Sequence, residues 1–90
     1  MKADREQIER LLKTARGQLD GILRMVEEDR YCIDIINQLL ATGALLGKAR
    51  NQILSAHLAS CVKQAFEQGE EAAAHEKIEE LIRVVERLTK

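Results

Sequence analysis

The feature that most constrains this chain is a stretch of about 36 residues in which nothing breaks a helix. From about Cys32 to Gln68, apolar side chains recur at steps of three and four residues, the spacing of a helix with one apolar face. The chain has no proline, and the internal Gly43 and Gly47 each cost a helix only about 1 kcal/mol relative to alanine. The spacing therefore predicts one helix over 32–68, about 54 Å long at about 1.5 Å per residue.

Two shorter helices are predicted on either side of this stretch. A helix-start pattern at Asp4 and the same apolar periodicity predict a helix over about 4–28, and Asp29 is placed to cap the helix that follows. The turn signal at 68–71 precedes a third helix, predicted over about 74–89. The sequence therefore predicts an all-α fold with three helices, the central one very long.

Composition agrees with a helical domain. Ninety residues form one domain, residues 1–90, close to the size at which a single core is barely sufficient. With one Phe, one Tyr and no Trp, the core must consist of Leu, Ile, Val and Ala, which suits packed helices better than a small sheet. A helix of about 54 Å is longer than any compact globule of this size, so its apolar stripe is buried only if other chains cover it. We therefore expect a homo-oligomer, most simply an antiparallel helical bundle.

Charge and motif content exclude several classes of protein. Charged residues make up 32% of the chain and its apolar runs are far shorter than the roughly 20 residues of a membrane span, so no membrane role is expected. Without a signal peptide at the charged N-terminus, a cytoplasmic location is expected, where cysteines stay reduced. The chain lacks a Cys-x-x-Cys pair, a glycine-rich phosphate loop and an acid–base pair, so it is not expected to be an enzyme or to have a small-molecule substrate.

Three residues have the chemistry of metal ligands. His57 and Cys61 are four residues apart, so on a helix both reach one ion. Cys32 precedes His57 by 25 residues, about 37 Å along a helix, so one chain cannot bring all three together. Antiparallel pairing of two long helices places Cys32 of one subunit beside His57 and Cys61 of the other, and symmetry makes two such sites per dimer.

The donor set favours a soft ion. Two sulfurs and one imidazole suit Cu(I), which accepts three ligands, whereas Zn(II) would need a fourth from His75, Glu80 or water. The alternative is that each cysteine is only a small buried apolar residue.

The spacing of these ligands resembles that of the copper-sensitive operon repressor (CsoR-like) family. Cys32, His57 and Cys61 match the family's ligand pattern, and the likeness extends over nearly the whole chain. It is also carried by the segments Arg16-Gly17-Gln18-Leu19-Asp20-Gly21-Ile22, Tyr31-Cys32-Ile33-Asp34-Ile35 and Ile78-Glu79-Glu80-Leu81. The resemblance implies a homotetramer, a dimer of dimers, that represses a copper-efflux operon by binding operator DNA and releases it when Cu(I) binds. It also implies that Tyr31 and Glu80 lie next to the ligands and hydrogen-bond to His57.

The DNA-binding residues are less sharply defined. The net charge of −1 does not indicate nucleic-acid binding, although residues 31–63 carry three basic groups and one acidic group, for +2. By the resemblance, Arg16 and Lys48 match basic positions of the family, while Leu11 stands where relatives often have arginine. Arg10, Lys13 and Arg16 at steps of three would form a basic stripe, with an ordinary solvated helix face as the alternative.

The resemblance also separates copper sensing from the signals of other relatives. Nickel- and cobalt-sensing relatives use a further histidine near the N-terminus, which this chain lacks, and persulfide-sensing relatives lack the histidine between the cysteines. Two alternative functions are nevertheless kept. A repressor of the same family that senses persulfide or thiol oxidation could link Cys32 to Cys61 of a neighbouring subunit. The other alternative is a cytosolic copper buffer with no DNA partner.

Overall fold

The computed structural model describes the backbone of residues 1–69 and 71–88, and the side chains of 1–69 and 75–88. This part of the chain forms three helices and no strands: α1 (Arg5–Glu27), α2 (Cys32–Glu67) and α3 (Glu71–Leu88). The predicted all-α fold with one very long central helix is confirmed, since α2 runs unbroken for 36 residues. The third helix begins at Glu71 rather than at about 74, because the alanines that follow Glu71 favour a helix even without apolar periodicity.

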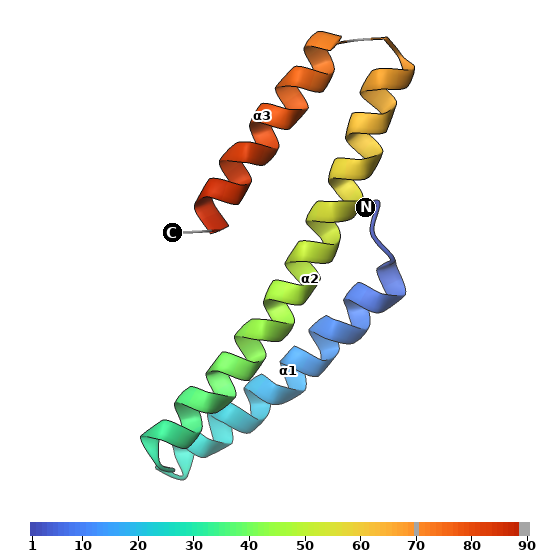
Figure 1. Ribbon diagram of the computed structural model, residues 1–90. Coiled ribbons are helices and arrows are strands. Elements are labelled where there is room, and N and C mark those ends of the chain that lie inside the picture. The colour runs from blue at the N-terminus through green and yellow to red at the C-terminus, as the bar shows by residue number, and fades with distance from the viewer. Residues whose placement is uncertain (70, 89–90) are drawn as a thin grey trace.

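The helices lie in a single layer. A short turn joins the end of α1 to the start of α2, so that α1 lies antiparallel along the first half of α2, and α3 folds back along the second half (Figure 1). In the part of the chain that is described, α1 and α3 do not contact each other. The protomer measures 59 × 29 × 13 Å, so it is only about one helix thick. Each half of α2 is thus covered by a different helix.

The turn between α1 and α2 differs from the prediction. Asp29 adopts a left-handed backbone conformation, with φ of 54°, just beyond the end of α1. The N–H of Arg30 donates to the carbonyl of Met25 at 2.9 Å, and the N–H of Asp29 to that of Val26 at 3.1 Å. These two bonds terminate α1 in a Schellman motif. The expectation that Asp29 caps α2 is therefore wrong: Tyr31 holds the cap position, without a side-chain hydrogen bond.

The core within one protomer is thin. Only six of the described residues are buried, three of them on the inner face of α1: Ile8, Ala15, Ile22, Thr42, Ala49 and Ala65. The one polar member, Thr42, has its hydroxyl 2.7 Å from the side-chain oxygen of Gln18 on α1. This part-buried hydrogen bond links the two helices and favours a single register between them.

Most of the large apolar side chains remain open to solvent. Leu40 is 67% exposed and Leu23 59% exposed, although both lie inside helices. The protomer's accessible surface is 6983 Å², whereas a compact monomer of 10.2 kDa has about 5,300 Å². Its radius of gyration is 17.9 Å, against about 12 Å for a compact domain of 90 residues. One protomer alone therefore leaves about 1,700 Å² more surface exposed than a compact monomer.

Candidate metal centre

The three predicted metal ligands lie at two distant points of α2. Cys32 is its first residue, while His57 and Cys61 lie in its second half. Because the helix is continuous, Cys32 and His57 are separated by about 37 Å. Within residues 1–69 and 71–88, no group of three or more His, Cys, Asp or Glu side chains is close enough to hold a metal ion. Each protomer thus offers a pair of donors at one place and a single thiol at another.

The pair of donors has the separation expected for two ligands of one ion. The sulfur of Cys61 is 3.4 Å from Nε2 of His57 and 3.8 Å from Nδ1. With metal–sulfur and metal–nitrogen bonds of about 2.3 and 2.05 Å, the two donor atoms would be about 3.6 Å apart in a tetrahedral centre and about 3.8 Å apart in a trigonal one. Cys32 and Cys61 are both free thiols, and Cys32 is exposed. Little side-chain movement is needed for His57 and Cys61 to bind together.

Helix α3 closes one side of this pair of donors. His57 and Cys61 line a cavity of about 60 Å³ between α2 and α3. The complete lining is Leu54, His57, Cys61, Lys77, Glu80, Leu81 and Val84. Glu80, which the resemblance placed next to the ligands, therefore shares a cavity with His57. Tyr31 lies beside Cys32 at the start of α2 and is exposed, so one protomer does not bring it near His57.

Lys77 is a member of this cavity that was not predicted from the sequence. Its ammonium lies 3.6 Å from the carboxylate of Glu80. Lys77, Glu80, Leu81 and Val84 follow the i, i+3, i+4, i+7 spacing of one helix face, which is the signal that could have identified it. His75 lies outside the cavity and pairs with Glu79 at 3.1 Å.

The donors and the glycines of α2 share one face of the helix. At about 100° per residue, Cys32, Gly43, Gly47, His57 and Cys61 fall within an arc of about 80°. The face that α1 covers, marked by the buried Thr42 and Ala49, lies about 110° away from it. A Cβ atom added at Gly43 would meet nothing within 4 Å, and one at Gly47 would meet only the Arg50 side chain. We refer to this arc of α2 as the open face.

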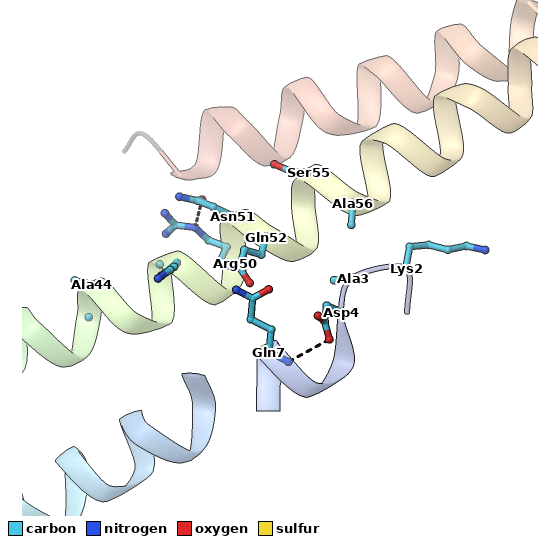
Figure 2. Close-up of a pocket in the computed structure, with 13 residues that line it drawn as sticks. Lys2, Ala3, Asp4, Gln7, Ala44, Arg50, Asn51, Gln52, Ser55 and Ala56 are labelled. Carbon is cyan, nitrogen blue, oxygen red and sulfur yellow. Dashed lines mark hydrogen bonds between the residues drawn. The ribbon is translucent and has the colours of Figure 1, made fainter. Parts of the chain in front are cut away.

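The predicted DNA-binding residues are all exposed, and one of the four lines a hollow in the surface. Lys48 lines an open hollow of about 940 Å³ between the start of the chain and the middle of α2 (Figure 2). Lys2 and Arg50 line it as well, and neither was predicted from the sequence. The other three predicted residues, Arg10, Lys13 and Arg16, lie on α1 outside the hollow.

The hollow is shaped by the beginning of α1. The carboxylate of Asp4 accepts a hydrogen bond from the backbone N–H of Gln7 at 3.3 Å, which starts the helix at this point (Figure 2). Across the hollow, Nε of Arg50 donates to the side-chain oxygen of Asn51 at 3.2 Å.

Among the described residues, no helix is both long and apolar enough to span a membrane.

An all-helical protomer with thiol and imidazole donors at two separate places on one face of its long central helix has the features of a subunit of a metal-responsive regulator. The family model of the metal-sensitive transcriptional repressors matches residues 4–87. The chain belongs to this family, which confirms the resemblance noted from the ligand spacing. Because the family consists of transcriptional repressors, the expectation that the chain is not an enzyme is also confirmed.

Individual relatives are copper-sensing repressors. The chain is 41% identical over 78 residues to the copper-sensing transcriptional repressor CsoR of Mycobacterium ulcerans, covering 87% of this chain and 67% of that protein. It is 37% identical over 87 residues to CsoR of Bacillus subtilis, covering 97% of this chain and 83% of the relative. The chain thus spans about two thirds of the length of the mycobacterial protein and most of the length of the Bacillus protein.

Two solved structures share the fold. The copper-sensing repressor CsoR of Geobacillus thermodenitrificans, crystallised with Cu(I), superposes with a TM-score of 0.83 at 36% identity, covering 94% of this chain and 85% of that one. The nickel-responsive transcriptional regulator InrS superposes with a TM-score of 0.79 at 23% identity, covering 97% and 94%. The second likeness concerns the fold alone, and the two names together indicate that proteins with this fold respond to different metals.

Proposed function

We propose that this protein is a Cu(I)-responsive transcriptional repressor that binds operator DNA when metal-free and releases it when Cu(I) binds between two subunits. The proposed ligands are Cys32 of one subunit and His57 and Cys61 of its neighbour. The observation that carries the proposal is the placement of the donors on the open face of one unbroken helix. The Cys32 thiol lies at its start, and the adjacent pair of His57 and Cys61 lies about 37 Å further along, too far for one chain to close the site. The names of the copper-sensing relatives support the choice of ion.

The position of the glycines supports antiparallel pairing of the open faces. When two copies of α2 pair antiparallel about a two-fold axis, the axis passes through the residue midway between any two positions that face each other. If Cys32 of one copy faces residues 57–61 of the other, this midpoint lies near residue 45. Gly43 and Gly47 lie on either side of this centre. Each costs an isolated helix about 1 kcal/mol, and neither is required by close packing inside the protomer. Because glycine has no side chain, Gly43 and Gly47 would let the backbone of a second α2 approach closely at this point.

The exposed apolar surface supports the same assembly. Ile36, Leu39 and Leu40 lie on or beside the open face of α2, and each is about half exposed or more. The excess surface of about 1,700 Å² is larger than the roughly 800 Å² that each partner contributes to a standard interface. We infer that the open face packs against its symmetry mate in a dimer and that further apolar surface joins two dimers into a tetramer.

The mechanism follows from where the ligands lie. When bound, Cu(I) supplies a link between two thiolates and one imidazole. The residues that would hold it are Cys32 at the start of one α2 and His57 and Cys61 in the second half of the neighbouring α2, with Glu80 of α3 lining the same cavity as the latter two. Because α1 is joined to the start of α2 by a short turn, a shift there also moves the basic residues of α1. A coupling of about 1–3 kcal/mol between the two sites is typical of such regulation.

The DNA face is assigned to the exposed basic residues. We propose that Arg10, Lys13, Arg16 and Lys48 contact operator phosphates, with Lys2 and Arg50 of the hollow placed beside Lys48. Phosphate contacts make affinity fall with salt, because each releases counterions from the DNA. The overall charge of −1 means that this local surface must account for DNA binding.

The test is an anaerobic titration of reduced protein with Cu(I) against a competing chelator, with a fluorescent promoter fragment in the same tube. We expect tight binding of one copper per subunit and simultaneous release of the DNA. Tight copper binding without any DNA response would instead indicate a copper buffer. Weak copper binding, with DNA release after addition of a persulfide donor, would indicate the thiol-sensing alternative at Cys32 and Cys61.

A further inference from the structure

The cavity beside His57 and Cys61 contains one pair of opposite charges. Apart from the proposed ligands themselves, Lys77 and Glu80 are the titratable side chains among its lining residues, and their charged groups are 3.6 Å apart. The remaining lining is apolar, from Leu54 on α2 and from Leu81 and Val84 on α3, while the side chains of Lys77 and Glu80 themselves stay about half exposed. Helix α3 thus brings both a carboxylate and an ammonium to the candidate metal centre.

The carboxylate of Glu80 affects which ion the centre favours. Two thiolates and one imidazole satisfy a three-coordinate Cu(I), but a divalent ion such as Zn(II) normally takes a fourth ligand, and a carboxylate oxygen is a common one. Glu80 lines the same cavity as His57 and Cys61, but within the described residues the three side chains are not close enough together to hold an ion. Glu80 would have to turn away from Lys77 to become that fourth ligand. A free carboxylate here would therefore shift the preference towards divalent ions.

We propose that Lys77 is a metal-specificity residue: its ammonium holds Glu80 in an ion pair and so withholds from His57 and Cys61 the oxygen donor that a divalent ion needs. This inference rests on the proposed copper site.

The chain offers a matched control for this ion pair. Lys63 and Glu67 on α2 form a pair of the same type at 3.9 Å, outside the cavity. Their side chains are 75% and 65% exposed, compared with 47% and 58% for Lys77 and Glu80. Replacement of Lys63 therefore removes one lysine and one helical ion pair without changing the lining of the cavity.

The test compares metal affinities of the reduced full-length chain and its variants by chelator competition with Zn(II) and with Cu(I). We expect Lys77→Met to raise Zn(II) affinity roughly two- to fivefold, the size of effect that release of a half-exposed ion pair can supply, and to change Cu(I) affinity much less. The double variant Lys77→Met/Glu80→Gln should return Zn(II) affinity to the wild-type value. Lys77→Arg, which keeps the charge, and Lys63→Met should both resemble wild type.

A spectroscopic readout identifies the ligand directly. Co(II) bound to Lys77→Met should have absorption bands in the visible range that differ from those of wild type, and the difference should vanish in the double variant. An unchanged Zn(II) affinity in Lys77→Met, or a gain that persists without Glu80, would overturn the inference while leaving copper binding by wild type intact. Failure of the wild-type chain to bind Cu(I) would overturn the proposed function itself, and this inference with it.

Discussion

The face of α2 towards α1 is buried within the protomer, whereas the centre of the open face is not covered by any element of the described chain. The face towards α1 carries the buried Thr42 and Ala49, and α1 contributes Ile8, Ala15 and Ile22 to the same core, so nearly all buried residues of the protomer gather here. The open face carries the proposed ligands and both internal glycines, and no element covers its centre in the described part of the chain. Folding and function are thus divided between faces of the same helix. The covered face holds the protomer together, and the open face is available to a second copy and a metal ion.

The largest expected effect is that of a bulky side chain at the centre of the open face. Gly43→Leu should weaken self-association by about 2–6 kcal/mol, because each of the two copies incurs the roughly 1–3 kcal/mol of an overpacked contact. The helix itself should remain intact, since leucine favours a helix more than glycine does. Sedimentation velocity measures the association, and circular dichroism measures the helix.

Asn37→Leu is the control for this change. Asn37 is exposed and lies about 120° from both the open face and the face towards α1. The substitution introduces the same side chain at a site where neither contact is made, so the oligomeric state should be that of wild type. Equal dissociation of both variants would contradict the assignment of the open face as the interface.

A cavity on the covered face should have a different consequence. Ile22→Ala removes a side chain that is only 6% exposed, so we expect a loss of about 2–4 kcal/mol in the free energy of unfolding. Protein that remains folded should still bind one copper per subunit, because Ile22 is buried against the covered face. Urea denaturation measures the loss of stability, and a parallel copper titration measures binding by the folded protein. Folded Ile22→Ala that bound less than one copper per subunit would contradict the assignment of stability and metal binding to different faces of α2.

The smallest expected effect lies in the turns, away from both faces. Asp29→Gly should stabilise the fold by about 0.5–1 kcal/mol, because glycine adopts the left-handed conformation of this position more readily than aspartate. Gly69, with φ of 68°, follows the end of α2 in the same way, so Gly69→Ala should destabilise by a similar amount. Thermal unfolding at matched concentration measures both, and neither should alter copper affinity.

The features that depend on local spacing were predictable from the sequence. Helical periodicity without proline predicted α2 at nearly its full length, and the i, i+4 spacing of His57 and Cys61 placed their side chains together, as the distance of 3.4 Å shows. The unbroken helix also implied that Cys32 could not join them in one chain. These predictions need no knowledge of how the helices pack.

What was not predictable depends on contacts between helices. Helical spacing puts Lys77 on the same face of α3 as Glu80, but that this face meets His57 and Cys61 depends on how α3 folds back on α2, which spacing alone does not fix. The left-handed conformation of Asp29 is set by the short connection between α1 and α2, and the cap it was expected to provide would have needed an extended backbone there. The DNA-contacting residues, which are solvated in the protomer, stay a prediction.

A metal centre shared between two open faces is tested most directly by complementation between two inactive subunits. Cys32→Ala and Cys61→Ser each remove one proposed thiolate, and each protein alone should bind Cu(I) roughly 100- to 1,000-fold more weakly than wild type, since each ligand of a thiolate-rich site contributes a few kcal/mol. When the two are unfolded together and refolded, a mixed dimer regains one complete site, formed by Cys32 of one subunit with His57 and Cys61 of the other. We expect about a quarter of the wild-type number of tight sites to return on mixing. No recovery in mixed dimers, or tight binding by Cys32→Ala alone, would contradict the shared centre.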